Sequence, residues 1–434
     1  MWNRCPVPLR SRLGLLAQHD FRQLFASTTV SQIGLQITQL AMSLVAIDQL
    51  GAGEFEAGLL ITVQFSAFLL MGLPAGALVD RLRRRSVLIA SDLGRAVLLV
   101  SVPVAWWAEL LTIWHLYLVA FGYGAMTVFF DAAYQSYLPH LVGRRGLVEG
   151  NAKLEAVRAV SQTAGPGLAG QLVRLLGAPV ALFVDALTMA ASVLFYARIR
   201  SREQRPARQP GARLRREIAE GLRFVFGQPL LRAIVMCTGT FNLFFALYTA
   251  MLIFFLRRDL EIGPGAIGLV LSIFSLGGLL GAVFARRFAS WVGQGRAIWM
   301  STAFGTPFLL LMPFAEVGWR LWLAAAASAV AAAGGVIYKV TQVSFRQALT
   351  PDHLLGRMNA TVRFLVWGAM PVGGLLGAVL GDRFGARVAV GVAVVGMCSA
   401  FLPVFLSGLR SMRTLPVEPV GVDRPSPDPD VRVG

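Results

Sequence analysis

The feature that most constrains this chain is a series of long apolar stretches separated by charged or Gly/Pro-containing turns. A helix crosses the hydrocarbon core of a membrane in roughly 20 residues and satisfies its own backbone hydrogen bonds there. Stretches of this kind fall at 24–48, 56–79, 86–107, 112–137, 154–176, 178–197, 230–256, 265–285, 297–315, 319–345, 361–381 and 386–408. The sequence therefore predicts an all-α membrane protein with twelve transmembrane helices.

Composition and charge distribution agree with a membrane location. The 434 residues are 56% hydrophobic and 15% charged, with a mean hydropathy of +0.64. On a soluble chain the net charge of +17 would suggest nucleic-acid binding. With a cytoplasmic N-terminus, however, 29 of the 40 lysines and arginines fall in inner segments and 6 in outer loops, a bias that orients membrane helices. We therefore expect a multi-pass protein of the cytoplasmic (inner) membrane, with both termini cytoplasmic and no nucleic-acid partner.

Residues that carry catalytic or metal chemistry are few and scattered. The cysteines and histidines are Cys5, Cys237, Cys398, His19, His115, His140 and His353. They form no metal-ligand or nucleophile-base spacing, so we predict no enzyme activity, no metal and no cofactor. No phosphate-binding G-x-x-x-x-G-K-[ST] loop occurs either, which makes a proton gradient the default energy source. A removable signal peptide is not expected, because charged residues precede the first apolar stretch.

The longest inner connection divides the apolar stretches six and six. Its last part, "LRREIAEGLRFVF", spaces apolar residues four apart (Leu214, Ile218, Leu222 and Phe226), which fits an amphipathic helix on the inner membrane surface. A solvated linker is the alternative. The expected segments are a cytoplasmic N-terminal tail (1–20), a six-helix bundle (21–198), a cytoplasmic linker (199–228), a second six-helix bundle (229–409) and a disordered cytoplasmic tail (410–434).

The two sets of six resemble each other in sequence. A shift of 205 residues places Gly76 on Gly281, within "GALVDRLR" and "GAVFARRF". A shift of 208 places Asn151 on Asn359 and Asp131 on Lys339. Together with the span count, these matches favour a duplicated six-helix unit.

Longer motifs carry a resemblance to a known family. "GLPAGALVDRLRRRSVL" resembles the G-x-x-x-D-R-x-x-R-R signature of the major facilitator superfamily. The segments 138–187 and 350–385 resemble its branch that holds the enterobactin exporter and macrolide-efflux-like permeases. The resemblance implies the major facilitator fold, with twelve helices in two pseudo-symmetric six-helix bundles, a central cavity and alternating access.

The signature also implies a gate on the cytoplasmic side. An aspartate at the end of a span can accept hydrogen bonds from the N-terminus of a facing helix, where the helix dipole favours an anion. By resemblance to the family, the gate would contain Gly76, Asp80 and Arg81, facing the helix that starts near Asn359. The alternative is that "DRLRRR" is a short basic turn that only sets topology.

Charged residues inside apolar stretches are costly and face a cavity or a partner, and four of them are candidate coupling residues. Asp131 and Lys339 occupy matching repeat positions with opposite signs, as do Glu155 and Arg363. One hypothesis is that pairs such as Asp131 with Lys339, or Glu155 with Arg363, bridge the two halves when the inner side is shut. The alternative is pairing within a half, such as Glu155 with Arg158, or Asp92 with Arg95. Asp131 is the candidate proton carrier.

Polar side chains also follow single helical faces, and polar stripes on membrane helices face protein or water. The family fold lines its cavity with its first, fourth, seventh and tenth helices. The candidate cavity residues on those spans are Gln32, Gln36, Gln39, Tyr123, Thr127, Asn242, Tyr248 and Gln342. Interhelical hydrogen bonding is the competing interpretation of the same residues.

"SQTAGPGLAGQL" (161–172) contains a literal G-x-G-x-x-G, yet no strand leads into it, so a dinucleotide site is not expected. Small residues allow helices to approach closely, and a proline bends a helix. The stretch resembles the Gly-Pro signature of family antiporters. We therefore predict a helix hinge at Gly165, Pro166 and Gly170, with a counterpart at Pro371 in the second half.

These features predict a secondary active transporter that works by alternating access. Proton-coupled efflux of an amphipathic organic compound, either a drug-like molecule or a secreted metabolite such as a siderophore, is the leading hypothesis. Uptake, lipid flipping, or a transport-inactive membrane sensor or scaffold are the alternatives. The expected partners are a small organic substrate, protons and the lipid bilayer, and the chain is expected to be a monomer.

Overall fold

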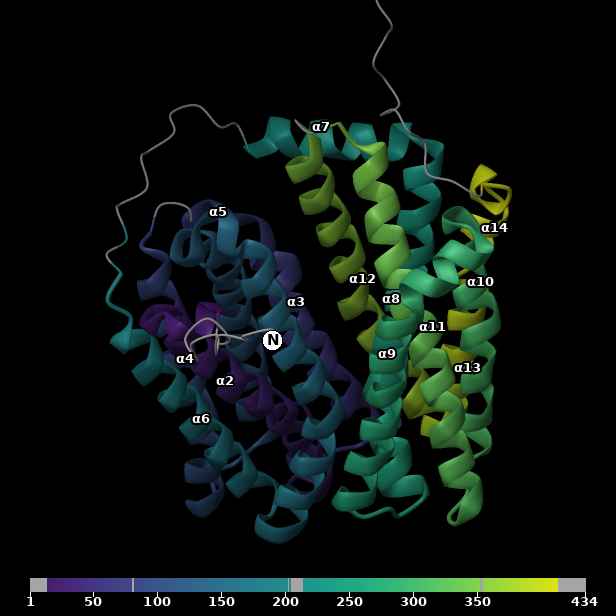
Figure 1. The fold of residues 1–434 in the computed structure, drawn as a ribbon. Coiled ribbons are helices and arrows are strands. Elements are labelled where there is room, and N and C mark those ends of the chain that lie inside the picture. Colours follow the sequence, from purple (N-terminus) through teal and green to yellow (C-terminus); the bar gives the residue numbers. More distant parts are fainter. Residues whose placement is uncertain (1–13, 80–81, 202, 204–213, 352–353, 413–434) are drawn as a thin grey trace, which may run out of the picture.

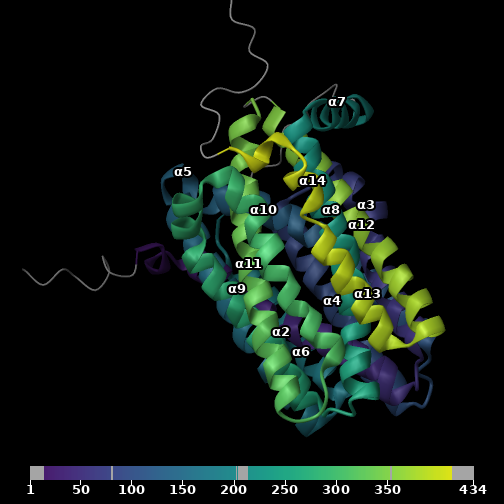
Figure 2. The same ribbon diagram turned by 90° about the vertical axis from the view of Figure 1, so that its right-hand side faces the viewer.

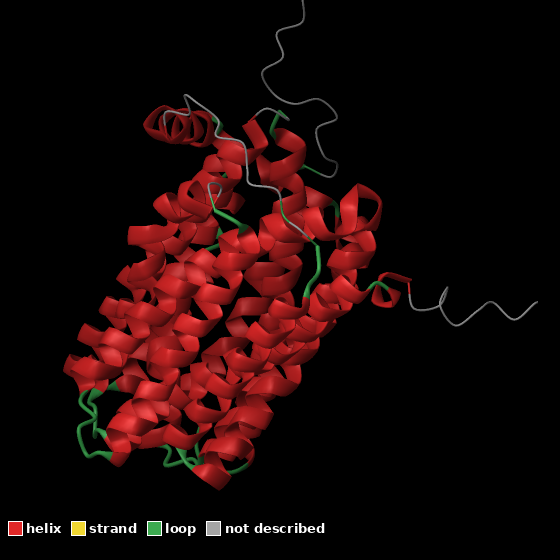
Figure 3. Cartoon of the chain, turned by 90° about the vertical axis from the view of Figure 1, so that its left-hand side faces the viewer, coloured by secondary structure: helices red, strands yellow, loops and turns green. Residues whose placement is uncertain are grey.

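A computed structural model describes residues 14–79, 82–201, 203, 214–351 and 354–412. Within these ranges the chain is helical and contains no strand (Figure 3). The first half contains η1 (Gly14–Ala17), α2 (His19–Leu44), η2 (Val45–Gln49), α3 (Glu54–Val79), α4 (Arg84–Trp107), α5 (Ile113–Leu176) and α6 (Ala178–Arg198). After α7 (Leu214–Gly227), the second half contains α8 (Pro229–Phe254), η3 (Phe255–Asp259), α9 (Pro264–Val292), α10 (Gln294–Gly305), η4 (Thr306–Phe314), α11 (Trp319–Leu349), α12 (Leu355–Phe384), α13 (Ala386–Ser399), α14 (Leu402–Phe405) and η6 (Gly408–Arg410).

Eleven segments among the described residues are long and apolar enough to cross a membrane, and they match eleven of the twelve predicted spans. The remaining predicted span, 154–176, lies in α5, which is two helices joined at a kink. Gly143 has φ 65° and ψ 174° at the kink, a conformation that glycine adopts without steric cost. The limb after Gly143 is helical, but it carries Gln162, Gln171 and Arg174 and is not among the eleven apolar segments.

The helices form two groups that lie side by side (Figures 1 and 2). In the first half α2 packs on α6, and α4 packs on α5 and α6. In the second half α11 packs on α9 and α10, and α8 packs on α12 and α13. Between the halves, α3 lies against α12 and α5 lies against α9. The interface therefore uses two helix pairs related by the internal repeat.

The hydrophobic core is shared by the halves at one end of the molecule only. We call this the distal end, and the opposite end, where α7 lies, the α7 end. One buried cluster at the distal end joins Leu44 and Ala169 of the first half to Leu247 and Phe255 of the second. Toward the α7 end the described residues form separate clusters, one in the first half around Leu88 and Tyr196 and two in the second half. The halves are thus packed together distally and have their own cores at the α7 end.

Glycines make the distal interface close. A Cβ at Gly58 on α3 would lie 2.6 Å from the backbone of Ala378 on α12. On the other side, a Cβ at Gly170 on α5 would lie 2.9 Å from the Cα of Gly268 on α9. Both distances are too short for a side-chain carbon, so the helix backbones meet directly at these points.

The linker helix α7 lies across the ends of the second-half helices, roughly perpendicular to them (Figure 1). Val225 is buried against Val235 of α8 and Met358 of α12. Glu220 forms an ion pair with Arg357. A helix is therefore present where the sequence allowed either a helix or a solvated linker, and its described part docks on the second half. Contact with a membrane surface remains a prediction.

Candidate functional site

The two halves are joined on the α7 side by an ion pair between Asp131 on α5 and Arg363 on α12. Arg363 Nη2 lies 3.7 Å from Asp131 Oδ2. The Asp131 side chain is 33% exposed and the Arg363 side chain is 41% exposed. One turn along α12, Trp367 stacks on Phe68 of α3 with ring centroids 4.9 Å apart. The pair therefore lies at the edge of the closed part of the interface, where solvent still reaches it.

In this structure the intramembrane charges have other partners than the pairs proposed for a closed inner side. Asp131 pairs with Arg363 and not with Lys339. Glu155 pairs within its own helix, with Arg158 at 3.3 Å, and not with Arg363. The reason is helix placement: α12 packs on α3 of the first half, whereas α11, which carries Lys339, packs on α9 and α10. A bridge between the halves is present, but it joins one member of each predicted pair.

A second set of polar groups is buried inside the first half. Asp92 and Arg95 on α4 form an ion pair, as the alternative interpretation proposed. Ser192 of α6 donates a hydrogen bond to Asp92 Oδ2 at 2.5 Å, and Ser27 of α2 lies 2.6 Å from the Ser192 hydroxyl. The Arg95 guanidinium also lies 4.3 Å from the centre of the Phe130 ring. The network ties three helices together through groups that water does not reach.

Asp185 on α6 is a fully buried acid that the sequence analysis did not select as a site residue. Its carboxylate accepts hydrogen bonds from Thr38 of α2 and, at 2.7 Å, from Thr188. An acid inside an apolar stretch is the sequence signal that could have identified it.

The candidate cavity residues separate into packed and accessible groups. Gln36 is buried against Gly165, and Tyr123 and Tyr248 are buried in the shared core, so these three side chains are packed between helices. Gln342 is also buried, whereas Gln32 and Thr127 are half-buried and Gln39 is exposed. Asn242 is half-buried, and its side-chain Nδ2 donates a hydrogen bond to the Val366 carbonyl at 3.4 Å.

The predicted cytoplasmic gate falls partly outside the described residues. Asp80 and Arg81 are not described, and Gly76 lies in α3 close to them. Asn359 is exposed near the start of α12. The gate contact therefore stays a prediction.

The distal end holds a second contact between the halves. Arg257 Nε donates to Asp48 Oδ1 at 2.8 Å, and Arg258 Nη2 donates to the Ile47 carbonyl at 2.9 Å. These residues lie in η2 and η3, two five-residue π-helices that end the first helix of each half. This pair was not predicted, although opposite charges at the ends of the first apolar stretch of each half were a usable signal.

The G-x-G-x-x-G stretch is helical throughout and belongs to the interface. Gly167 N donates to Ser272 Oγ of α9 at 2.8 Å, and a Cβ at Gly268 would lie 2.3 Å from the Pro166 carbonyl. Pro371 is buried within α12. The glycines thus serve close helix packing, in a setting unlike a nucleotide loop. Bending at Gly165, Pro166, Gly170 and Pro371 remains a prediction.

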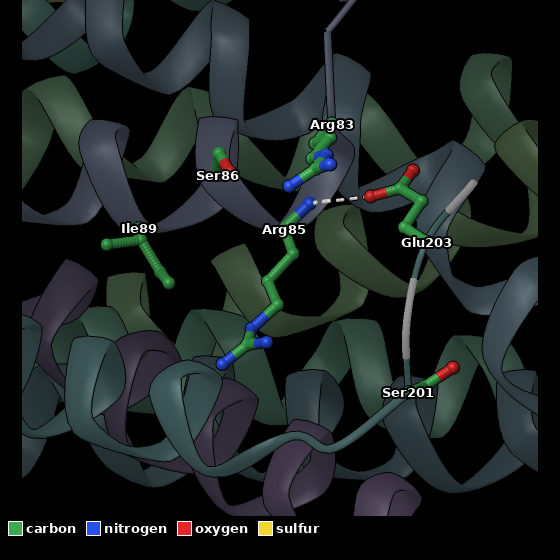
Figure 4. Close-up of a pocket in the computed structure, with 6 residues that line it drawn as sticks. All are labelled: Arg83, Arg85, Ser86, Ile89, Ser201 and Glu203. Atoms are coloured by element: carbon green, nitrogen blue, oxygen red, sulfur yellow. Dashed lines mark hydrogen bonds between the residues drawn. The ribbon is translucent and has the colours of Figure 1, made fainter. Parts of the chain in front are cut away.

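A cavity of about 450 Å³ lies outside this interface, at the α7 end of the first half (Figure 4). Arg85 fills one side and donates to the carbonyls of Tyr196 at 2.9 Å and Ala197 at 2.6 Å. Its backbone N–H donates to Glu203 at 3.2 Å. Because these bonds satisfy the last carbonyls of α6, the arginine has a structural role here.

Known proteins resemble this chain in sequence and in architecture. A family model described as Major Facilitator Superfamily matches residues 24–370. The chain is 28% identical over 403 residues to the multidrug efflux pump Tap of Mycolicibacterium fortuitum, covering 88% of this chain and 94% of that protein. It is 24% identical over 439 residues to the enterobactin exporter EntS of Citrobacter koseri, covering 94% and 97%.

Solved structures with the same fold include a bacterial homologue of the iron transporter ferroportin in an inward-facing state. Its TM-score is 0.71 at 14% identity, with 89% of this chain and 98% of that chain covered. The nucleoside transporter NupG has a TM-score of 0.71 at 13% identity, with 89% and 99% covered. At these identities the likeness concerns the fold alone.

Proposed function

This chain belongs to the Major Facilitator Superfamily, and we propose that it exports an amphipathic organic compound by alternating access, coupled to proton movement. Two curated relatives that match it over nearly their whole length are a multidrug efflux pump and an exporter of a secreted metabolite. This full-length similarity supports efflux over uptake, lipid flipping or a sensory role.

The observation that carries the proposal is the unequal closure of the two ends. The halves share a core distally, and Asp48 with Arg257 closes that end. At the α7 end each half has its own core, and the partly exposed Asp131–Arg363 pair lies between them. If the α7 end faces the cytoplasm, as the arginine distribution predicts, this is a state that accepts substrate from inside.

Asp131 is the acid best placed to couple a proton to this cycle. It lies between the halves, it is reached by solvent, and its partner Arg363 belongs to the opposite half. Protonation removes the charge that attracts Arg363, so the contact between the halves weakens when the proton binds. A proton on Asp131 and the position of the halves are thereby linked.

Accumulation of dyes in cells without their own efflux pumps tests the proposed function. The probes are ethidium, N-phenyl-1-naphthylamine and 8-anilinonaphthalene-1-sulfonate, a cation, a neutral compound and an anion. We expect lower accumulation of at least one dye in cells that express the protein, and loss of the difference after a protonophore. Equal accumulation of all three would contradict export, and higher accumulation would indicate uptake.

A further inference from the structure

Three cations of the second half, Lys339, Arg346 and Arg363, lie on α11 and α12 away from the distal end, and the described residues of this half include no acid on these helices there. Its described acids are Asp259, Glu261, Glu316 and Asp382, and each lies at the distal end of a helix or in a distal loop. Arg363 is satisfied by Asp131 of the first half. Lys339 and Arg346 on α11 are then the two of these cations without an acidic partner among the described residues.

Lys339, Gln342 and Arg346 lie on one face of α11, since residues three and seven apart share a helical face. The positions span roughly 10 Å along the helix, with Gln342 in the middle. Arg346 is 8% exposed and its Nε has no hydrogen-bond partner among the described residues. Gln342 is 5% exposed, and its Oε1 likewise has no described partner. Lys339, nearest the middle of the membrane, is exposed.

The described acids on neighbouring elements at this end are already engaged. Asp131 pairs with Arg363 at 3.7 Å and Glu155 with Arg158 at 3.3 Å. Glu220 on α7 pairs with Arg357. The helices packed against α11, which are α9, α10 and η4, contain no Asp or Glu in their described sequence, and neither does α8.

We propose that Lys339, Gln342 and Arg346 form a subsite for the acidic group of the transported compound, which makes the substrate an amphipathic organic anion. This inference rests on the proposed function and specifies its substrate class. A carboxylate, sulfonate or phenolate satisfies the two cations, and an adjacent N–H or O–H of the compound donates to Gln342 Oε1. The stacked Phe241 and Phe245 rings of α8, 5.9 Å apart, supply aromatic surface for the rest of the molecule.

The test compares two dyes that differ in their acidic group. The full-length protein in lipid nanodiscs is titrated with 8-anilinonaphthalene-1-sulfonate and with its neutral analogue N-phenyl-1-naphthylamine. The wild type is expected to prefer the sulfonate. Lys339→Gln and Arg346→Gln each weaken sulfonate binding roughly tenfold and leave the neutral dye within about twofold, because a hydrogen bond to a charged group is lost. Lys339→Arg and Arg346→Lys keep the preference.

Two controls separate the subsite from general charge effects. Arg287→Gln removes an exposed cation at the same end of the second half and leaves both affinities unchanged. Asp352→Asn tests the acid that follows α11 in the sequence and lies outside the described residues. We expect this variant to bind the sulfonate with unchanged affinity.

Several outcomes would overturn the subsite. These are no sulfonate binding to the wild type, no preference over the neutral dye, equal losses for both dyes in the Gln variants, or a gain of sulfonate affinity in Asp352→Asn. Because the readout is binding at equilibrium, it is independent of efflux. A sulfonate preference without dye export would contradict the proposed function alone, and export without the preference would contradict the subsite alone.

Discussion

The Asp48 carboxylate on η2 accepts a hydrogen bond from Arg257 on η3 at 2.8 Å, which joins the last turns of two repeat-related helices across the distal end. Both side chains are partly exposed. In the proposed alternating-access cycle this pair stabilises the closed distal end, so changing it is expected to alter the balance between the two states.

We expect Asp48→Asn to increase opening of the distal end. A partly exposed ion pair contributes up to about 1 kcal/mol, so the open population rises by up to roughly fivefold. The measurement is labelling of Thr62→Cys by a membrane-impermeant maleimide from outside, in a cysteine-free background, because Thr62 packs against Gly374 in the closed interface. Glu316→Gln, which breaks a distal ion pair within one half, is the control. Equal labelling in all variants would show that the pair does not hold the gate.

Gly58→Ala should impair transport by preventing distal closure. Its Cβ would lie 2.6 Å from the Ala378 backbone, and overpacking of this kind costs about 1–3 kcal/mol. Gly72→Ala on the same helix is the matched control, because its Cβ meets no described atom within 4 Å. Gly72→Ala is expected to be neutral or slightly stabilising. The measurements are dye efflux and the thermal unfolding midpoint, and equal behaviour of the two variants would argue against close packing at Gly58.

Arg95→Gln should destabilise the first half strongly. Removal of one partner leaves Asp92 as an uncompensated buried charge, at a cost of about 3–5 kcal/mol. Arg158→Gln breaks the exposed pair with Glu155 and should cost less than about 1 kcal/mol. Thermal unfolding in detergent compares the two. The double variant Asp92→Asn with Arg95→Gln is expected to be more stable than Arg95→Gln alone, and a further loss would contradict the role of the unpaired charge.

Docking of η1, the turn that carries Leu15, onto α5 should depend on pH. The hydrogen bond from Lys153 and the backbone hydrogen bond from Leu15 lower the pKa of Glu149, which lies in α5 just after the kink at Gly143. A lowered carboxyl pKa stabilises the folded form above the ordinary carboxyl pKa, and the contribution is lost as the pH falls through the lowered value. We expect protection of the Leu15 amide from hydrogen exchange to fall in that acidic range, after correction for intrinsic exchange. Protection in Glu149→Gln should lack this step, and an identical step in both would exclude Glu149.

The sequence was sufficient for eleven of the twelve predicted spans, because the length of an apolar stretch is a local property. It also marked Asp131 and Arg363 as special, since charges inside apolar stretches need a partner. It could not choose between Arg363 and Lys339 for Asp131, because that choice depends on which helix of one half packs on the other.

Other features had weaker local signals or none. The π-helical turns η2 and η3 depend on how the first helix of each half ends against its neighbours. Their sequences, "VAIDQ" and "FLRRD", contain no pattern that predicts a π-helix. The polar stripe on α2 was ambiguous for a related reason. Gln36 and Gln39 share a helical face by spacing, yet Gln36 is covered by Gly165 of α5 and Gln39 is exposed.

Proton coupling through Asp131 can be measured in proteoliposomes with an imposed pH gradient. A compound whose accumulation the protein lowers is added, and dissipation of the gradient is followed with a pH-sensitive dye for wild type, Asp131→Asn and the control Glu316→Gln. We expect substrate-dependent dissipation with wild type and Glu316→Gln, and none with Asp131→Asn. Dissipation by Asp131→Asn at the wild-type rate would contradict this coupling.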